Sequence, residues 1–336
     1  MPRPLFVASH IGRWHMSIMS STPTEQAEAL AHRGEATAAA RVLDAAGHAG
    51  DADAAFMLAL WCLTGQQIVR NLAAARYWFG VSGELGRLDA ANVCASFLAS
   101  GVGGPRNWPG ALAGLVTLSR SQADAARQLA LIGAMQIDAV GDPTNPPVGE
   151  AIGSPLPITR FPGFCTAEEC AFIADAAAPL FEPANVVDPR TGAPVRNLVR
   201  TSDTAAFPFV DESPALHAIN RRIASVSRTL PEQGEPLQVL RYRPGQEYRP
   251  HIDALPGAVN QRIATMLIYL NDGYEGGQSH FLHTGFSVEV KAGDAILFQN
   301  CRDGAPDMAM LHAGLPVRRG TKLIASRWIR ARPFFG

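Results

Sequence analysis

Residues 238–253, QVLRYRPGQEYRPHID, place a histidine and an aspartate two positions apart at the end of a strand-like segment. Side chains at positions i and i+2 of a strand project from the same face of a sheet, so we expect one short strand to supply both His251 and Asp253. We expect the third ligand, His312, on a strand distant in sequence but adjacent in space, as the opposing sheets of a small barrel allow. Two imidazoles and one carboxylate leave three open positions on a ferrous ion. The pattern predicts an iron site that carries out chemistry, although a lone His-x-Asp pair is also common in solvated loops.

Three later blocks extend this pattern. They are residues 267–271 (LIYLN) with Gly276, Gly277 and Phe281 downstream, residues 293–298 (GDAILF), and residues 312–317 (HAGLPV) leading to residues 320–322 (GTK). In their order and spacing, residues 157 to 332 resemble the prolyl 4-hydroxylase family of 2-oxoglutarate-dependent oxygenases. The resemblance implies a double-stranded β-helix, or jelly roll, with supporting helices.

The resemblance also implies roles for individual residues. His251, Asp253 and His312 become the Fe(II) ligands, and Lys322 becomes the partner of the distal carboxylate of 2-oxoglutarate. Tyr242 and Tyr269 become supporting hydroxyls near the co-substrate. Chemistry supports the role of Lys322 independently, because strand alternation places it on one face with Ile324, Ser326 and Trp328, and an ammonium that faces a barrel interior needs an anion. An exposed lysine at a strand end is the alternative.

The function implied is dioxygenase catalysis with Fe(II), 2-oxoglutarate and O2, with ascorbate as an expected further requirement. We expect hydroxylation of a prolyl residue in a peptide or protein, with release of succinate and carbon dioxide. Asp253 favours oxygen transfer, because halogenating relatives need a vacant carboxylate position. The same fold also serves free amino acids and small metabolites, and residues 277–279 (GQS) depart from the usual Gly-Glu-Thr of the family. Four arginines are candidates for a substrate carboxylate or for solvated loop charge: Arg241, Arg243, Arg249 and Arg262.

Two hypotheses of other classes remain open at this point. The chain could be an adaptor whose helical repeats bind a partner, with a silent or sensory oxygenase-like module. It could also be a cupin-like metal enzyme that does not use 2-oxoglutarate. The intact triad together with Lys322 counts against the adaptor.

Composition agrees with a cytoplasmic enzyme. The chain has 336 residues, 47% of them hydrophobic, and a net charge of −1, which gives no electrostatic footprint for nucleic acid. Five cysteines lie scattered without CxxC pairs, which indicates neither a zinc knuckle nor a disulfide framework. No apolar run is long enough to span a bilayer, and the first residues lack a continuous apolar stretch typical of a signal peptide.

The first 140 residues are rich in alanine and show a repeat of 36 residues. Residues 49–55 (AGDADAA) recur as residues 85–91 (LGRLDAA), and Gly65 and Asn71 recur as Gly101 and Asn107. This period predicts helix hairpins in which small residues allow close approach and glycine closes the turns. The segment resembles Sel-one-like repeats, relatives of the tetratricopeptide class. A concave surface for a protein partner and a simple scaffold are both consistent with such an array.

The expected organisation is therefore α+β and multidomain. We predict an N-terminal extension at 1–24, a helical repeat domain at 25–138, a linker rich in proline and glycine at 139–156, and the oxygenase domain at 157–336. Within the last part, Thr166 begins a helix through residue 180 and a second helix covers residues 214–229. Short strands dominate after Leu237.

Overall fold

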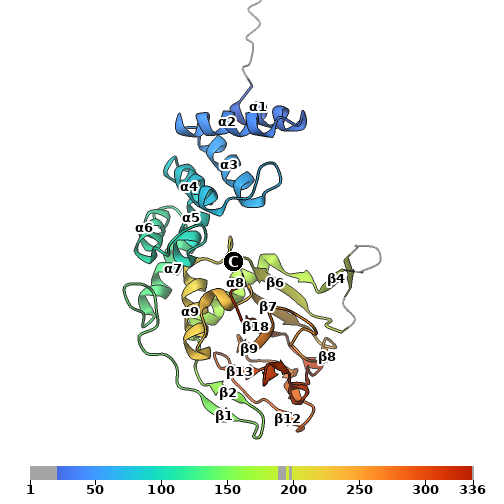
Figure 1. Cartoon of the computed structure of the whole chain (residues 1–336). Helices are drawn as coiled ribbons and strands as arrows, with labels where there is room; N and C mark the ends of the chain where they lie inside the picture. The colour runs from blue at the N-terminus through green and yellow to red at the C-terminus, as the bar shows by residue number, and fades with distance from the viewer. Residues whose placement is uncertain (1–20, 188–193, 197–198, 335–336) are drawn as a thin grey trace, which may run out of the picture.

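The computed structural model describes residues 21–187, 194–196 and 199–334 (Figure 1). Most of the expected N-terminal extension, residues 1–20, lies outside the described residues. Helices come first along the chain, and strands follow with two further long helices among them. In the described part of the chain, no helix has the length and apolar character needed to cross a membrane.

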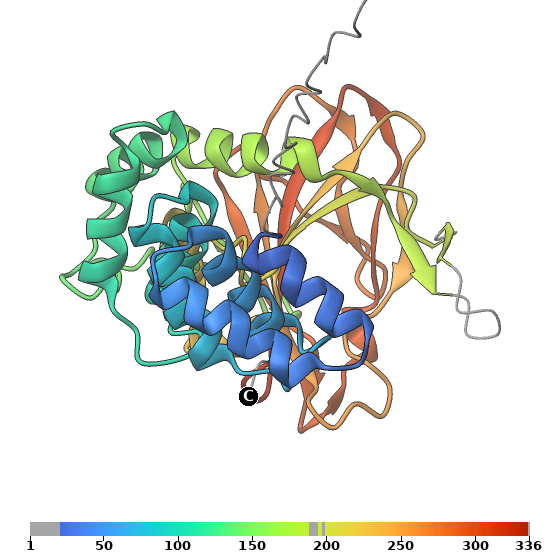
Figure 2. The ribbon, with the colours of Figure 1, turned by 90° about the horizontal axis from the view of Figure 1, so that it is seen from above.

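Seven helices form a stack in which each helix packs against the next. They are α1 (Pro23–His32), α2 (Ala36–His48), α3 (Ala52–Thr64), α4 (Leu72–Glu84), α5 (Leu88–Ser100), α6 (Trp108–Leu118) and α7 (Ala123–Ala134). The stack extends away from the strands, with α1 and α2 farthest from them (Figure 1). Seen from above, the last helices of the stack lie to the left of the strands, and the first helices, in blue, lie in front and partly over the strands (Figure 2).

The 36-residue repeat corresponds to equivalent backbone positions. Gly65 and Gly101 both end a helix in the left-handed conformation, with φ of +72° and +83°, which glycine adopts without strain. Asn71 and Asn107 each cap the following helix, because their side chains accept a hydrogen bond from the third backbone N–H beyond them. The pairs α3–α4 and α5–α6 are therefore two copies of one helix hairpin.

Small residues allow the hairpins to stack closely, as expected from the alanine content. A Cβ atom on Gly83 would lie 2.9 Å from the Cα atom of Ala91, so α4 and α5 touch backbone to backbone at this point. The equivalent pair one repeat earlier is Gly47 and Ala55, where a Cβ on Gly47 would lie 3.3 Å from the Ala55 Cβ. Larger side chains at these positions would push the helices apart.

Two antiparallel sheets form the sandwich that follows. The larger sheet has the strand order β1-β2-β13-β9-β18-β7-β6-β3, and the smaller sheet has the order β12-β11-β16-β8. The bounds in the larger sheet are β1 Glu150–Ile152, β2 Ile158–Phe161, β3 Glu182–Pro183, β6 Asp203–Phe207, β7 Leu237–Tyr242, β9 Arg262–Tyr269, β13 Ala295–Gln299 and β18 Lys322–Arg330. Those in the smaller sheet are β8 Tyr248–His251, β11 Ser279–Phe281, β12 Phe286–Ser287 and β16 His312–Gly314.

Three two-stranded ribbons complete the strands. They are β4 (Asn185–Val187) with β5 (Pro194–Arg196), β10 (Glu275–Gly276) with β17 (Val317–Arg319), and β14 (Cys301–Arg302) with β15 (Ala305–Pro306). This architecture is the expected jelly roll preceded by helical repeats. Strand β1 lies inside residues 139–156, the stretch that we predicted as linker, and the domain limits themselves stay a prediction.

Helices α8 (Ala167–Ala177) and α9 (Pro214–Ser227) cover the outer face of the larger sheet. Thr166 caps α8 as expected. In this capping box the Thr166 hydroxyl accepts from the backbone N–H of Glu169, and the Glu169 carboxylate accepts from the backbone N–H of Thr166. Ser213 caps α9. The α8 cap is worth about 1 kcal/mol and fixes where the chain turns from β2 into the helix.

Apolar side chains gather in three cores. One lies within the first helices of the stack, around Leu58 and Phe79. A second fills the space between the two sheets, around Phe281 and Phe298. The third joins α6 and α7 to α8, α9 and the outer face of the larger sheet. The end of the helical stack is therefore part of the hydrophobic core of the sandwich.

Candidate functional site

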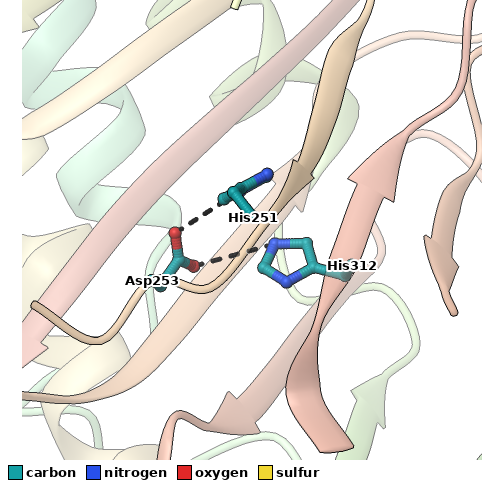
Figure 3. A group of neighbouring side chains, drawn as sticks. All are labelled: His251, Asp253 and His312. Atoms are coloured by element: carbon teal, nitrogen blue, oxygen red, sulfur yellow. Dashed lines mark ion pairs between the residues drawn. The ribbon is translucent and has the colours of Figure 1, made fainter. Parts of the chain in front are cut away.

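His251 and His312 lie opposite each other on neighbouring strands of the smaller sheet. Strand β8 ends at His251, β16 begins at His312, and the two residues are direct partners in the antiparallel register. Asp253 lies in the turn after β8. Its Oδ1 is 3.6 Å from His251 Nε2, and its Oδ2 is 3.9 Å from His312 Nε2 (Figure 3). The potential ligand atoms of the three side chains all lie within 4.8 Å of one another.

Two details of our strand prediction are wrong. We expected one strand to carry both His251 and Asp253, but the strand stops at His251. The ligand atoms of the two side chains nevertheless lie together, with Asp253 Oδ1 next to His251 Nε2. We also expected opposing sheets to bring His312 close; its strand is distant in sequence and adjacent in space, as expected, but it belongs to the same sheet as His251. Adjacent antiparallel strands bring facing side chains to within about 5.5 Å, which suits two ligands of one ion.

The two imidazoles are held in the same tautomer. His251 Nδ1 lies 2.8 Å from the carbonyl oxygen of Arg249, and His312 Nδ1 lies 2.9 Å from that of Met310. A carbonyl only accepts, so each Nδ1 carries the proton and donates it. Each Nε2 is then left with a lone pair directed toward the Asp253 carboxylate. This is the arrangement in which backbone carbonyls orient histidines for metal binding.

The electrostatics of the triad also suit a cation. Burial, reinforced by the neighbouring His312, lowers the pKa of His251 to about 4, so this imidazole is neutral at neutral pH. Burial tends to raise the pKa of Asp253, but His312, His251 and a hydrogen bond from Thr265 outweigh it and lower the pKa below its usual value. An ionised carboxylate and imidazole lone pairs thus converge in a buried space. The donor set fits a ferrous ion in a facial triad.

Lys322 begins β18 and extends into the same pocket as the triad. It is 3% exposed, and its Nζ donates to the carbonyl oxygen of Gly277 at 2.6 Å. Among the described residues no carboxylate forms an ion pair with it. Burial lowers the pKa of Lys322 to about 7. A buried ammonium without an anion is unfavourable, so this side chain suits an anionic ligand that enters the pocket.

The two predicted tyrosines lie close to Lys322 in different ways. Tyr242 is the register partner of Lys322 and lines the pocket, with the centre of its ring 5.8 Å from Nζ. The Tyr269 ring centre is 5.2 Å from Nζ, but its hydroxyl is 2.8 Å from Ser279 Oγ, and Ser279 lines the pocket in its place. Burial raises the pKa of both phenols, so both stay protonated and able to donate. Their roles toward a co-substrate stay predictions.

Strand alternation places further residues in the pocket, as expected for β18. Ile324, Ser326 and Trp328 line it together with Lys322. The four arginines that we considered for a substrate carboxylate are each paired with a carboxylate of the protein: Arg241 and Arg243 with Asp203, Arg249 with Glu247, and Arg262 with Glu235. Each of the four guanidinium groups thus already has an anionic partner within the protein.

Sequence reasoning missed several residues around the triad. Tyr248 stacks on His251, with ring centres 3.4 Å apart. Thr265 donates to Asp253 Oδ2, and Asn300 donates to Thr265. Thr265 shares its strand face with Leu267 and Tyr269, so alternation along β9 could have indicated it. Asn300 carried no such signal, because it follows the last residue of β13.

Comparisons with known proteins give a consistent result. Residues 237–330 match the family model described as the 2OG-Fe(II) oxygenase superfamily. Prolyl 4-hydroxylase 1 from Arabidopsis thaliana is 38% identical over 189 residues, which cover 50% of this chain and 67% of that protein.

Two solved structures are also similar to this chain. The viral collagen prolyl hydroxylase of Paramecium Bursaria Chlorella virus-1, in its 2OG complex, is 27% identical with a TM-score of 0.44 and covers 54% of this chain and 100% of that chain. A Sel1 repeat protein from Oxalobacter formigenes is 25% identical with a TM-score of 0.28 and covers 32% of this chain and 33% of that one.

Proposed function

This chain belongs to the prolyl 4-hydroxylase family of 2-oxoglutarate- and Fe(II)-dependent oxygenases, and we propose that it hydroxylates a prolyl residue in a peptide or protein. The observation that carries the proposal is the pairing of two features in one pocket. Three lone-pair donors converge at His251, Asp253 and His312, and beside them lies the buried ammonium of Lys322, which pairs with no carboxylate of the described residues. A metal ion and a dicarboxylate together satisfy both features.

In this proposal His251, Asp253 and His312 hold Fe(II), and Lys322 binds the distal carboxylate of 2-oxoglutarate. When bound, iron would activate O2, and 2-oxoglutarate would supply two of the four electrons that reduce it, so that one oxygen atom ends in succinate, released with carbon dioxide, and the other in the hydroxylated substrate. Tyr242 donates its phenolic proton toward the co-substrate, and Tyr269 acts through Ser279. Ascorbate keeps the iron reduced between turnovers.

The residues of the chain contribute positioning and electrostatics. The backbone carbonyls of Arg249 and Met310 fix the tautomers of the two histidines, so no proton has to move before metal binds. Tyr248 stacks flat on His251 and shields one face of its ring from water. Gly277 holds the Lys322 ammonium in the pocket through its carbonyl oxygen until a carboxylate replaces that bond. These groups are in place in the fold, which reduces the reorganisation needed on binding.

For the helical repeats we propose recruitment of the protein substrate. Curved helical arrays offer extended surfaces for chains that a small pocket cannot hold by itself. The array also shares a hydrophobic core with the sandwich, so its position relative to the catalytic pocket is fixed by packing. A substrate bound to the array would therefore be presented at a defined distance from the site.

The experiment that tests the function measures succinate formed from 2-oxoglutarate by anaerobically iron-loaded protein after exposure to air with ascorbate. We expect iron-dependent succinate that is lost in His312→Ala, and stimulation by proline-containing peptides. Stimulation by free proline or another small molecule alone would place the substrate among metabolites. If iron and 2-oxoglutarate both failed to bind, the chain would act as an adaptor.

A further inference from the structure

The carboxylate of Asp253 is held by a chain of two buried hydrogen bonds. Thr265 Oγ1 lies 2.6 Å from Asp253 Oδ2, and Asn300 Nδ2 lies 2.9 Å from Thr265 Oγ1. All three side chains are buried, with Thr265 fully inaccessible and Asn300 2% exposed. Neither Thr265 nor Asn300 lines the pocket. They therefore act on the site only through Asp253.

The direction of both bonds follows from the chemistry of the three groups. An ionised carboxylate only accepts hydrogen bonds, so the single proton of the Thr265 hydroxyl must point to Asp253. The Thr265 oxygen can then only accept, which requires the amide nitrogen of Asn300 to face it. Asn300 Oδ1 is left buried and without a hydrogen-bond partner among the described residues. A buried oxygen without a hydrogen bond is costly to keep.

The backbone makes this chain of bonds rigid. Thr265 lies in the middle of β9, where β13 and β18 pair with it on both sides. The backbone N–H of Asn300 donates to the Ile263 carbonyl at 2.8 Å, and the Asn300 carbonyl accepts from Asp307 at 3.0 Å. Asp253, by contrast, lies in a turn. The larger sheet thus holds Thr265 and Asn300 in place, and their hydrogen bonds orient the side chain of Asp253, which lies outside the strands.

We propose that Thr265 and Asn300 are positioning residues that set the orientation of the Asp253 carboxylate, occupy Oδ2, and so direct Oδ1 to a metal ion shared with His251 and His312. The inference rests on the proposed function, because it needs the triad to bind metal. Oδ1 is 3.6 Å from His251 Nε2, and Oδ2, which accepts the Thr265 bond, is 3.9 Å from His312 Nε2. A carboxylate with both oxygens free could rotate or bind through either one, and the fixed bond to Oδ2 removes that freedom.

A purely structural role for these residues predicts a different result. If the Thr265 hydroxyl only satisfied a buried carboxylate, its removal would lower folding stability and leave metal affinity unchanged. Asn300 separates the two roles more sharply. Replacing it by leucine removes the unpaired Oδ1, so the stability of the metal-free protein should be little affected. Metal affinity should still fall, because Thr265 loses the donor that orders its hydroxyl.

The test compares metal affinity and folding in the full chain. The variants are Thr265→Val, which removes the hydroxyl at nearly constant volume, Thr265→Ser, which keeps it, and Asn300→Leu. Thr229→Val is the matched control, since the Thr229 hydroxyl is hydrogen-bonded to Ser227 at the end of α9 and neither residue lines the pocket. Affinity is measured by anaerobic equilibrium dialysis with Fe(II) and by the visible absorption of bound Co(II). Thermal unfolding of the metal-free proteins reports folding.

We expect Thr265→Val to raise the Kd for Fe(II) by about 10-fold or more and to change the Co(II) spectrum, as loss of an outer partner of a ligand does. Thr265→Ser should stay within about twofold of the wild type, and Asn300→Leu should raise Kd severalfold with little loss of stability. Unchanged metal affinity in a folded Thr265→Val, or equal weakening in Thr265→Ser, overturns the inference. If Thr265→Val does not fold, the metal affinity of Asn300→Leu tests the inference instead, and an affinity equal to that of the wild type overturns it. Failure of the wild type to bind either metal refutes the proposed function instead.

Discussion

Lys322 Nζ and the carbonyl oxygen of Gly277 are 2.6 Å apart, and this is the one hydrogen bond of the Lys322 ammonium among the described residues. Lys322 and Lys291 are the two lysines of the chain, whose other basic residues are arginines and histidines. An ammonium can lose its proton when buried, whereas a guanidinium cannot. This difference is consistent with the proposal that Lys322 binds an anion reversibly.

The pKa of Lys322 can be measured directly. Protein labelled with carbon-13 at lysine Cε gives one NMR signal for each of two lysines, and Lys322→Met identifies the signal of Lys322. We expect a titration midpoint near pH 7, because burial disfavours the charged form. Addition of 2-oxoglutarate should move the midpoint upward, since a bound carboxylate favours the ammonium. A midpoint that 2-oxoglutarate leaves unchanged would contradict direct pairing.

Co-substrate affinity should depend on pH through the same group. Below about pH 7 Lys322 is protonated and ready to pair, whereas above it binding must include uptake of a proton. We expect the Kd of 2-oxoglutarate to rise toward about tenfold per pH unit above pH 7. The Lys322→Met variant should lose this slope and bind 2-oxoglutarate about 10- to 100-fold more weakly at pH 7, as expected for loss of a charged hydrogen bond. Titration calorimetry measures both the pH dependence of the Kd and the loss of affinity in Lys322→Met, with Lys291→Met as the control.

Lys322→Met should also stabilise the ligand-free protein. The folded pKa, about 7, is below the ordinary value of 10.5, so between these pH values the unfolded chain binds the proton that the folded protein lacks. The free energy of unfolding of the wild type therefore falls as the pH decreases from 10.5 to 7. Below pH 7 the ammonium is charged in both states, and its burial then costs the folded protein the full amount. The gain in Lys322→Met should be largest at or below pH 7 and disappear above about pH 10. Urea unfolding at pH 6.5 and 10 measures it, and equal stability at pH 6.5 would show that the ammonium is not buried.

Removing a ligand of the triad should abolish metal binding without unfolding the chain. We expect His251→Ala, Asp253→Ala and His312→Ala each to lose turnover and to lose the rise in unfolding temperature that Fe(II) gives the wild type. That rise corresponds to about 2.7 kcal/mol when free metal is at 100 times Kd. His280→Ala is the control, because His280 bonds to Ser287 on the edge strand β12 and not to the triad. Retention of full activity in any triad variant would contradict the proposal that His251, Asp253 and His312 bind Fe(II).

Shortening the helical stack should give two distinct outcomes. Without residues 1–50 the chain loses α1 and α2, which pack within the first core only, so the sandwich should keep its unfolding temperature within a few degrees. Without residues 1–137 it also loses Trp108, Leu115 and Leu118, which are buried in the core shared with α9. Each such loss of a large buried side chain costs about 2–5 kcal/mol, so this chain should be unfolded or aggregated. Calorimetry of both proteins is the check, and a stable sandwich without α5–α7 would contradict the shared core.

Sequence alone determined the residue types of the site and the local structure that carries them. Spacings inside one element follow fixed backbone periods, so the face shared by Lys322 and Trp328, the Thr166 cap and the repeat of 36 residues were all predictable. The family resemblance added the order of the blocks along the chain. Both rest on relations between residues that are close in sequence or that recur at a constant offset.

Tertiary structure alone decided which strands are neighbours and what is buried. It placed His312 beside His251 in one sheet, brought Asn300 and Thr265 to Asp253, and buried Lys322 where no carboxylate in the described part of the chain pairs with it. It also joined the helical stack to the core of the sandwich. Strand pairing and burial arise from contacts between distant segments, and many pairings satisfy the same local pattern. The convergence of His251, Asp253 and His312 could therefore be predicted from sequence, whereas the groups that contact these side chains could not.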